Sequence, residues 1–137
     1  MFEQYQRVLS QHYKLALGTS IDNIPNVRIV NFCFKDPSTL YFTSVRGNQK
    51  IAEFDENCNI AFTTVPDSGF EHVRSKTACA KRSVCELKDV SDIFLKQVPG
   101  FDQTIVEIGE LLDLFEINIK SATVILGVNE EETFSFD

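Results

Sequence analysis

From residue 14 onward, the sequence alternates apolar with polar or small residues, in short segments separated by turn-forming residues. Segment 27–35 (VRIVNFCFK) is predicted to be one such strand, with Val27, Ile29, Asn31 and Cys33 on one face and Arg28, Val30, Phe32 and Phe34 on the other. A period of two residues is typical of β-strands, and strands joined by tight turns pair in antiparallel fashion. Because such segments recur along the chain, we predict a closed antiparallel β-barrel or a sandwich.

The predicted elements are mainly strands, accompanied by a few short helices. Turns between them are marked by Asp, Asn, Pro and Gly, as at Asp36-Pro37-Ser38. The acidic tail 129–137 is predicted to be mobile, and all 137 residues (1–137) are expected to form one domain. Strands are predicted over 14–20, 27–35, 39–45, 58–65, 70–87 (one strand or a strand pair), 112–119 and 123–128, with a hairpin turn at Lys120-Ser121, and helices over 2–13, 49–54, 90–98 and 103–111.

Charge and hydropathy exclude several classes of partner. The formal net charge is −7, with 13 Lys and Arg against 20 Asp and Glu, so we expect no nucleic-acid partner. The longest apolar runs are too short to span a bilayer, and residues 1–14 are too polar for a signal-peptide core. We therefore expect no membrane association and a cytoplasmic location.

The cysteines and histidines give no clear sign of a catalytic or metal site. Cys33, Cys58, Cys79 and Cys85 lack the close spacing of a zinc cluster, so we predict no metal and four reduced, mostly buried thiols. His12 and His72 are predicted to be surface or partly buried residues rather than catalytic bases.

One constellation suits an anion. Arg28 lies in a predicted strand, Thr43 and Ser44 end another, and Gln49-Lys50 open a helix after Gly47-Asn48. A helix start offers free backbone N–H groups and a partial positive charge, while Arg and Lys supply fixed cations for a phosphate. The alternative is ordinary turn punctuation with solvated basic residues. Neither a phosphate loop of nucleoside triphosphatases nor a Gly-x-Gly-x-x-Gly dinucleotide motif is present.

Four segments in this order resemble one known family. Arg28-Ile29-Val30, 41–44 (YFTS), 49–52 (QKIA) and 57–62 (NCNIAF) look like the flavin half of the pyridoxamine 5′-phosphate oxidase-like family. The resemblance covers roughly residues 12–82, and 115–117 (FEI) is similar to the last strand of the family. It implies a six-stranded antiparallel split barrel that binds flavin mononucleotide (FMN) and pairs into a homodimer with two flavin sites at the interface.

The resemblance also implies roles for individual residues. Arg28 and Lys50 would hold the FMN phosphate, and Thr43 and Ser44 would donate hydrogen bonds to it. Further cofactor contacts would come from Ile29, Val30 and Asn31 along the flavin ring or ribityl chain and from Phe42 packed beside it, whereas Ser75 aligns only loosely with a polar flavin contact of the relatives.

Two departures from the family pattern bear on function. Gln49-Lys50 stands where the oxidases of the family have Arg-Lys, so one cation for the phosphate is missing. The Arg-Leu-x-Pro segment that the oxidases carry near the C-terminus has no counterpart here, so the substrate is not expected to be a vitamin B6 phosphate. We expect an FMN-dependent oxidoreductase acting on an unidentified small substrate or electron donor, with catalytic residues unassigned. The alternatives are a non-catalytic flavin-binding or stress-related barrel, a cofactor-free interaction domain, or haem in place of FMN.

Overall fold

The computed structural model describes residues 2–47 and 49–136, without the side chains of 49–51. It contains seven strands in one sheet, with the order β3-β2-β1-β4-β5-β6-β7 and a further β3–β6 pairing. All pairings are antiparallel. The elements are α1 (Phe2–Ser10), β1 (Lys14–Ile21), β2 (Ile24–Asp36), β3 (Thr39–Val45), α2 (Gln49–Glu56), β4 (Asn59–Thr64), β5 (His72–Arg82), α3 (Leu87–Gln97), α4 (Phe101–Ile108), a short 3-10 turn (Gly109–Leu111), β6 (Leu112–Gly127) and β7 (Glu130–Ser135).

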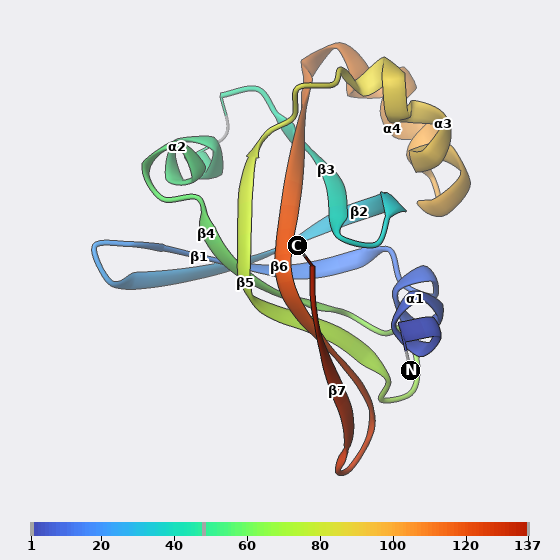
Figure 1. Cartoon of the computed structure of the whole chain (residues 1–137). Helices are drawn as coiled ribbons and strands as arrows, with labels where there is room; N and C mark the ends of the chain where they lie inside the picture. Colours follow the sequence, from blue (N-terminus) through green and yellow to red (C-terminus); the bar gives the residue numbers. More distant parts are fainter. Residues whose placement is uncertain (1, 48, 137) are drawn as a thin grey trace.

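The β3–β6 pairing closes strands β1 to β6 into the predicted barrel. Strand β6 has 16 residues and pairs with three strands. Its first half pairs with β3, its second half pairs with β7, and residues 115–125 pair with β5. Figure 1 shows the second half of β6 leaving the barrel together with β7. Six strands therefore form the closed barrel, and the seventh extends the sheet beyond it.

The predicted hairpin turn at Lys120-Ser121 is wrong, because β6 runs straight through it. The β5–β6 register shifts there, with Thr77 opposite Ser121 but Ala78 opposite Ile119, so Lys120 is an extra residue in the ladder. Ser121 is held by the hydroxyl of Thr77, which lies 2.5 Å from its own hydroxyl. The polar pair thus marks a β-bulge rather than a turn.

The prediction of a mobile acidic tail is also wrong for residues 129–136, whereas residue 137 lies outside the described residues. Residues Glu130–Ser135 form β7, and the hydroxyls of Thr133 and Thr123 lie 2.7 Å apart across the β6–β7 pair. The ring of Phe134 packs edge-on against Phe2 and next to Tyr5 of α1. Pairing and aromatic packing therefore order the tail, while its glutamates remain exposed.

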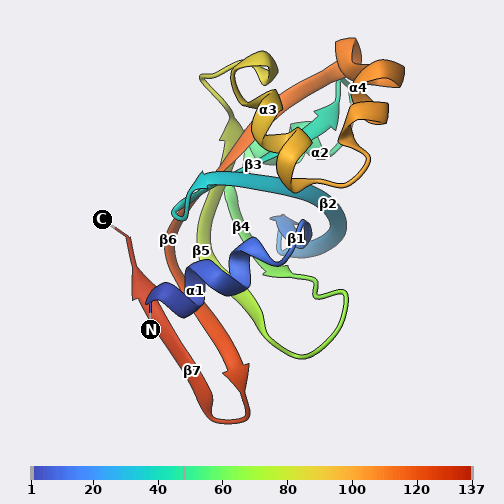
Figure 2. The ribbon, with the colours of Figure 1, turned by 90° about the vertical axis from the view of Figure 1, so that its right-hand side faces the viewer.

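Two hydrophobic clusters lie on opposite sides of the barrel wall. The larger fills the interior and includes Phe32, Phe42 and Phe115, with α1 packed against one side. The smaller lies outside, where Phe94 of α3 and Phe101 of α4 stack over Cys33 of β2 and Leu114 of β6. Figure 2 shows α3 and α4 covering this outer face. None of the helices in the described part of the chain combines the length and apolar character needed to cross a bilayer.

The prediction of four reduced thiols is wrong for one pair. Cys58 and Cys79 are joined by a disulfide, with their Cα atoms 4.9 Å apart. The β4–β5 register brings them together, because Asn59 pairs with Cys79 and Cys58 precedes it. Twenty-one positions separate the two in sequence, so spacing could not reveal the partnership. Cys33 and Cys85 are free, the first buried and the second half-buried.

Candidate functional site

The alternation of β2 divides the predicted site residues between the two faces of the barrel wall. Val30 is 5% exposed and belongs to the interior cluster, and Arg28 shares its face. Ile29 is 58% exposed on the opposite face, and Asn31 is exposed there too. A ligand that contacts the backbone of this strand from outside would therefore meet Ile29 and Asn31, but not the side chain of Val30.

Arg28 is positioned by an ion pair that the sequence did not reveal. Its Nη2 donates to Oε1 of Glu53, on α2, at 2.5 Å, and to Oγ1 of Thr19, on β1, at 3.3 Å. Thr19 in turn donates to Oε2 of Glu53 at 3.0 Å. The side chains of Arg28 and Glu53 are only 17% and 15% exposed, so solvent screens this pair less than a surface pair. The only signal in the sequence was an acidic residue in the helix that starts at Gln49.

Two buried side-chain N or O atoms in the described part of the chain have no hydrogen-bond partner: Nη1 of Arg28 and Oγ of Ser44. Ser44 is 3% exposed and lies near the end of β3, which leads into α2. An unsatisfied buried donor or acceptor costs about 1–3 kcal/mol, so proteins rarely leave one without a reason. Both atoms belong to residues that the sequence assigned to phosphate binding, and neither has its hydrogen-bonding capacity used within the described chain.

The described residues on either side of position 48 agree with the predicted break between β3 and α2. Gly47 adopts a φ of +83°, a left-handed conformation that suits glycine, and α2 starts at Gln49 as expected. Thr43 is half-buried on the face of β3 opposite Ser44. The side chains of Gln49 and Lys50 lie outside the described residues, so their predicted contacts with a phosphate remain predictions.

Phe42 lies in the interior of the barrel rather than at its surface. It is fully buried, with its ring centroid 5.4 Å from that of Phe115 and 5.7 Å from that of Phe54 on α2. Ser75, on β5, is also buried, and its hydroxyl donates to the carbonyl of Ser121 at 2.6 Å. The structure thus gives Phe42 a packing contact with the helix of the candidate site, and Ser75 a role in the β5–β6 bulge.

A cavity of about 790 Å³ hollows the outer face of the barrel. Small residues of β1 and β4, including Gly18 and Ala61, line it together with His72, Arg74 and Lys76 of β5. Nδ1 of His72 lies 2.7 Å from the carbonyl of Phe70, which can only accept, so Nδ1 carries the hydrogen. In the neutral ring, Nε2 is then a free acceptor. The sequence did not predict this cavity, because the strands that line it are far apart along the chain.

The imidazole of His12 forms a hydrogen bond with the hydroxyl of Thr64 on β4. Its Nδ1 lies 2.9 Å from Oγ1 of Thr64, which also accepts the backbone N–H of Val73 at 2.9 Å. Burial lowers the pKa of His12, and nearby His72 adds to the shift, while Asp67 and Glu71 oppose it. The arrangement suits a structural histidine that is neutral in the folded chain.

This lowered pKa predicts a pH dependence of stability. Because the unfolded chain binds the proton more readily, with an ordinary pKa of about 6.5, the free energy of unfolding should fall as pH drops below that value. In urea titrations at about pH 7.5 and about pH 5.5, the wild type should lose more stability than His12→Gln. Equal losses in the two proteins would contradict the assignment.

The sequence matches the family model described as pyridoxamine 5′-phosphate oxidase-like over residues 8–131. The chain belongs to this family. Among curated proteins, none is significantly similar to it in sequence. The expected family is therefore confirmed, over more of the chain than the resemblance covered.

Solved structures place the chain among the split barrels of the pyridoxamine 5′-phosphate oxidase-like family. A haem-binding protein from Mycobacterium smegmatis has a TM-score of 0.78 at 11% identity, covering 97% of this chain and 57% of that protein, so this chain spans little more than half of it. A NimC/NimA family protein from Clostridium acetobutylicum has a TM-score of 0.70 at 21% identity, covering 98% and 94% of the two chains. An FAD-binding protein from Mesorhizobium loti has a TM-score of 0.69 at 14% identity, covering 90% and 93%. At these identities the likeness shows the fold alone.

Proposed function

We propose that this member of the pyridoxamine 5′-phosphate oxidase-like family binds FMN by its phosphate, where β3 leads into α2, and acts as an oxidoreductase on a small molecule. The observation that carries the proposal is the pair of unpartnered buried atoms, Arg28 Nη1 and Ser44 Oγ. Both are suited to an oxyanion, as a charged donor and a hydroxyl donor. Bound FMN would supply the redox chemistry, accepting and passing on hydride or single electrons.

The residues around the phosphate would divide the work of binding it. Glu53 and Thr19 fix one arm of the Arg28 guanidinium and leave the Nη1 arm for the ligand. Ser44 would donate its hydroxyl hydrogen, and Lys50 would add a point charge from the first turn of α2. Because Glu53 already compensates Arg28, the dianion would depend more on Lys50 and on the backbone N–H groups of the helix start.

Phosphate recognition is tested by comparing three flavins. In titrations that follow the quenching of flavin fluorescence by the protein, we expect FMN to bind with a lower Kd than the other two flavins. Riboflavin lacks the phosphate, and in FAD the phosphate is extended by an adenylyl group. A charge-assisted hydrogen bond is worth about 1.5–3 kcal/mol, so riboflavin should bind at least roughly tenfold more weakly. Equal affinities for FMN and riboflavin would overturn the proposed site.

Turnover separates the oxidoreductase from its alternatives. If FMN binds and the loaded protein oxidises a reduced nicotinamide, the enzyme is supported. If FMN binds without turnover of any donor, the chain is a flavin-binding barrel, and if no flavin binds, it is an interaction domain. Haem in place of FMN would appear as a Soret absorbance band on reconstitution with haem.

We also propose that the chain forms a homodimer through the outer face of the β1–β2 hairpin. Val27 and Ile29 are 67% and 58% exposed on this face of the arm, which Figure 1 shows projecting from the barrel. Val27 also borders the large outer cavity, so a second copy could cover both. A twofold, isologous interface would then provide the second wall of a flavin site.

Sedimentation tests the dimer. The FMN-loaded wild type should sediment as a dimer at micromolar concentration, and Val27→Asp should dissociate it, because a carboxylate at the centre of an apolar interface would be buried without a partner. Val106→Asp, at an 80% exposed position on α4, is the matched control and should leave the dimer intact. A wild type that remains monomeric at high micromolar concentration would contradict the proposal.

A further inference from the structure

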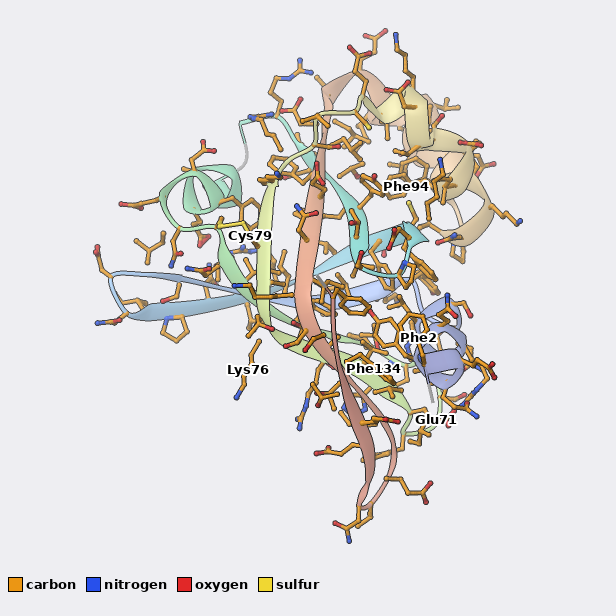
Figure 3. The ribbon with its side chains drawn as sticks, viewed as in Figure 1. Phe2, Glu71, Lys76, Cys79, Phe94 and Phe134 are labelled. Carbon is orange, nitrogen blue, oxygen red and sulfur yellow. A yellow bond between two sulfur atoms is a disulfide. The ribbon has the colours of Figure 1, made fainter. Side chains whose placement is uncertain are left out.

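A second cavity, of about 500 Å³, opens beside the disulfide. It is lined by Cys79 of β5 but not by its partner Cys58, and both cysteines are half-buried. Figure 3 shows the disulfide at Cys79, with Lys76 on the same strand extending away from the barrel. Cys79 therefore borders a space large enough for a small molecule.

The charge around this cavity is opposite to that of the chain. Lys76 and Lys120 are its only charged lining residues in the described part of the chain, although the net charge of the whole sequence is −7. Neither lysine forms an ion pair with another described residue. Asn59 and Asn118 add neutral hydrogen-bonding groups to the wall. The cavity thus favours a small anion over a cation.

Both lysines of the cavity lie at irregularities of the strand register. Lys120 is the extra residue of β6 opposite the Thr77–Ala78 step of β5. Lys76 lies at the register shift of β5 against both neighbouring strands. Bulges re-aim side chains in this way, and here both lysines border the same space as Cys79.

We propose that this cavity is a thiol–disulfide exchange site for a small thiol that carries a carboxylate. The thiolate of the reagent attacks Sγ of Cys79, a new disulfide forms between the reagent and Cys79, and Cys58 leaves as a thiolate that takes up a proton. A second reagent thiolate then attacks the reagent sulfur of this mixed disulfide. The two reagent molecules leave joined as a disulfide, and Cys79 is released as a thiolate that takes up a proton. In sum, two small thiols are oxidised to one disulfide, and the Cys58–Cys79 bond is reduced by two electrons.

The other cysteines lack this setting. Burial raises the pKa of the Cys33 thiol to about 12, with a smaller contribution from Asp92, so Cys33 carries almost no thiolate at neutral pH. Cys85 is half-buried beside the outer cluster and does not line the cavity. Exchange at this cavity should therefore be specific for Cys79.

The first test compares the reduction of the oxidised full chain by 3-mercaptopropionate, which is anionic, and by 2-mercaptoethanol, which is neutral. Alkylation of the released thiols and mass spectrometry give the rates. The Lys76→Gln/Lys120→Gln variant should react about three- to tenfold more slowly than the wild type with the anionic thiol, because two nearby charges are lost, and almost equally with the neutral one. Lys96→Gln, exposed on α3, is the matched control and should change neither rate.

The second test identifies the sulfur that reacts. With the disulfide of 3-mercaptopropionate, Cys58→Ser should form a mixed disulfide at Cys79, whereas Cys79→Ser should leave Cys58 unmodified. Three results would overturn the proposal: an oxidised chain that shows no Cys58–Cys79 bond by mass, lysine variants that slow both thiols equally, or modification at Cys58 rather than Cys79.

Discussion

Replacing Arg28 or Lys50 with alanine is expected to weaken FMN binding by roughly ten- to a hundredfold, while riboflavin binding stays nearly unchanged. Each variant removes one cation from the proposed phosphate site, and a charge-assisted hydrogen bond is worth about 1.5–3 kcal/mol. Riboflavin has no phosphate and should not respond. Fluorescence-quenching titrations of the two ligands against each variant give both affinities.

Two further variants sharpen this comparison. Arg28→Lys should restore binding only in part, since an ammonium cannot donate to Glu53 and to the ligand in the geometry of a guanidinium. Gln49→Arg should tighten FMN by supplying the cation that the oxidases carry. Arg28→Ala also leaves Glu53 without its ion-pair partner, so the free energy of unfolding of this variant must be measured separately. Equal losses for FMN and riboflavin would show that these residues serve the fold rather than the phosphate.

Phe42→Ala is expected to reduce the free energy of unfolding by about 3–5 kcal/mol, as is typical when a buried aromatic residue is truncated. Its ring is fully buried between Phe115 and Phe54, so truncation leaves a cavity inside the barrel. Phe70→Ala is the matched control, because Phe70 is 57% exposed and should cost less than about 1 kcal/mol. Urea unfolding of the FMN-free proteins gives both values. Similar losses for the two variants would contradict the interior position of Phe42.

Local patterns predicted most of the fold. Strand β3 lies at the predicted residues 39–45, because alternation and its flanking turns define it without reference to the rest of the chain. The errors came where one strand depends on another: β6 continues through Lys120 because a bulge absorbs the extra residue, and β7 is ordered because it pairs with β6. A single sequence does not contain this register information.

The candidate site was predictable only in part, for a similar reason. The two-residue period of a strand predicted that Arg28 and Val30 share one face of β2. Because both faces of β2 carry large apolar residues, the sequence did not indicate which face points into the barrel. That ambiguity hid the interior position of Phe42 on the neighbouring strand. Glu53 could not be assigned to Arg28 from sequence, because their contact spans 25 positions and depends on how α2 rests on the barrel.

The contact between Arg28 and Glu53 bears on when the proposed flavin would be acquired. A cation whose sole counter-ion was the ligand would leave an uncompensated buried charge in the empty protein, and folding would then require the ligand. Here a carboxylate of the same chain neutralises the guanidinium beforehand. Arg28 therefore does not need a ligand for charge compensation, and if the barrel binds flavin as proposed, folding would not have to wait for the cofactor.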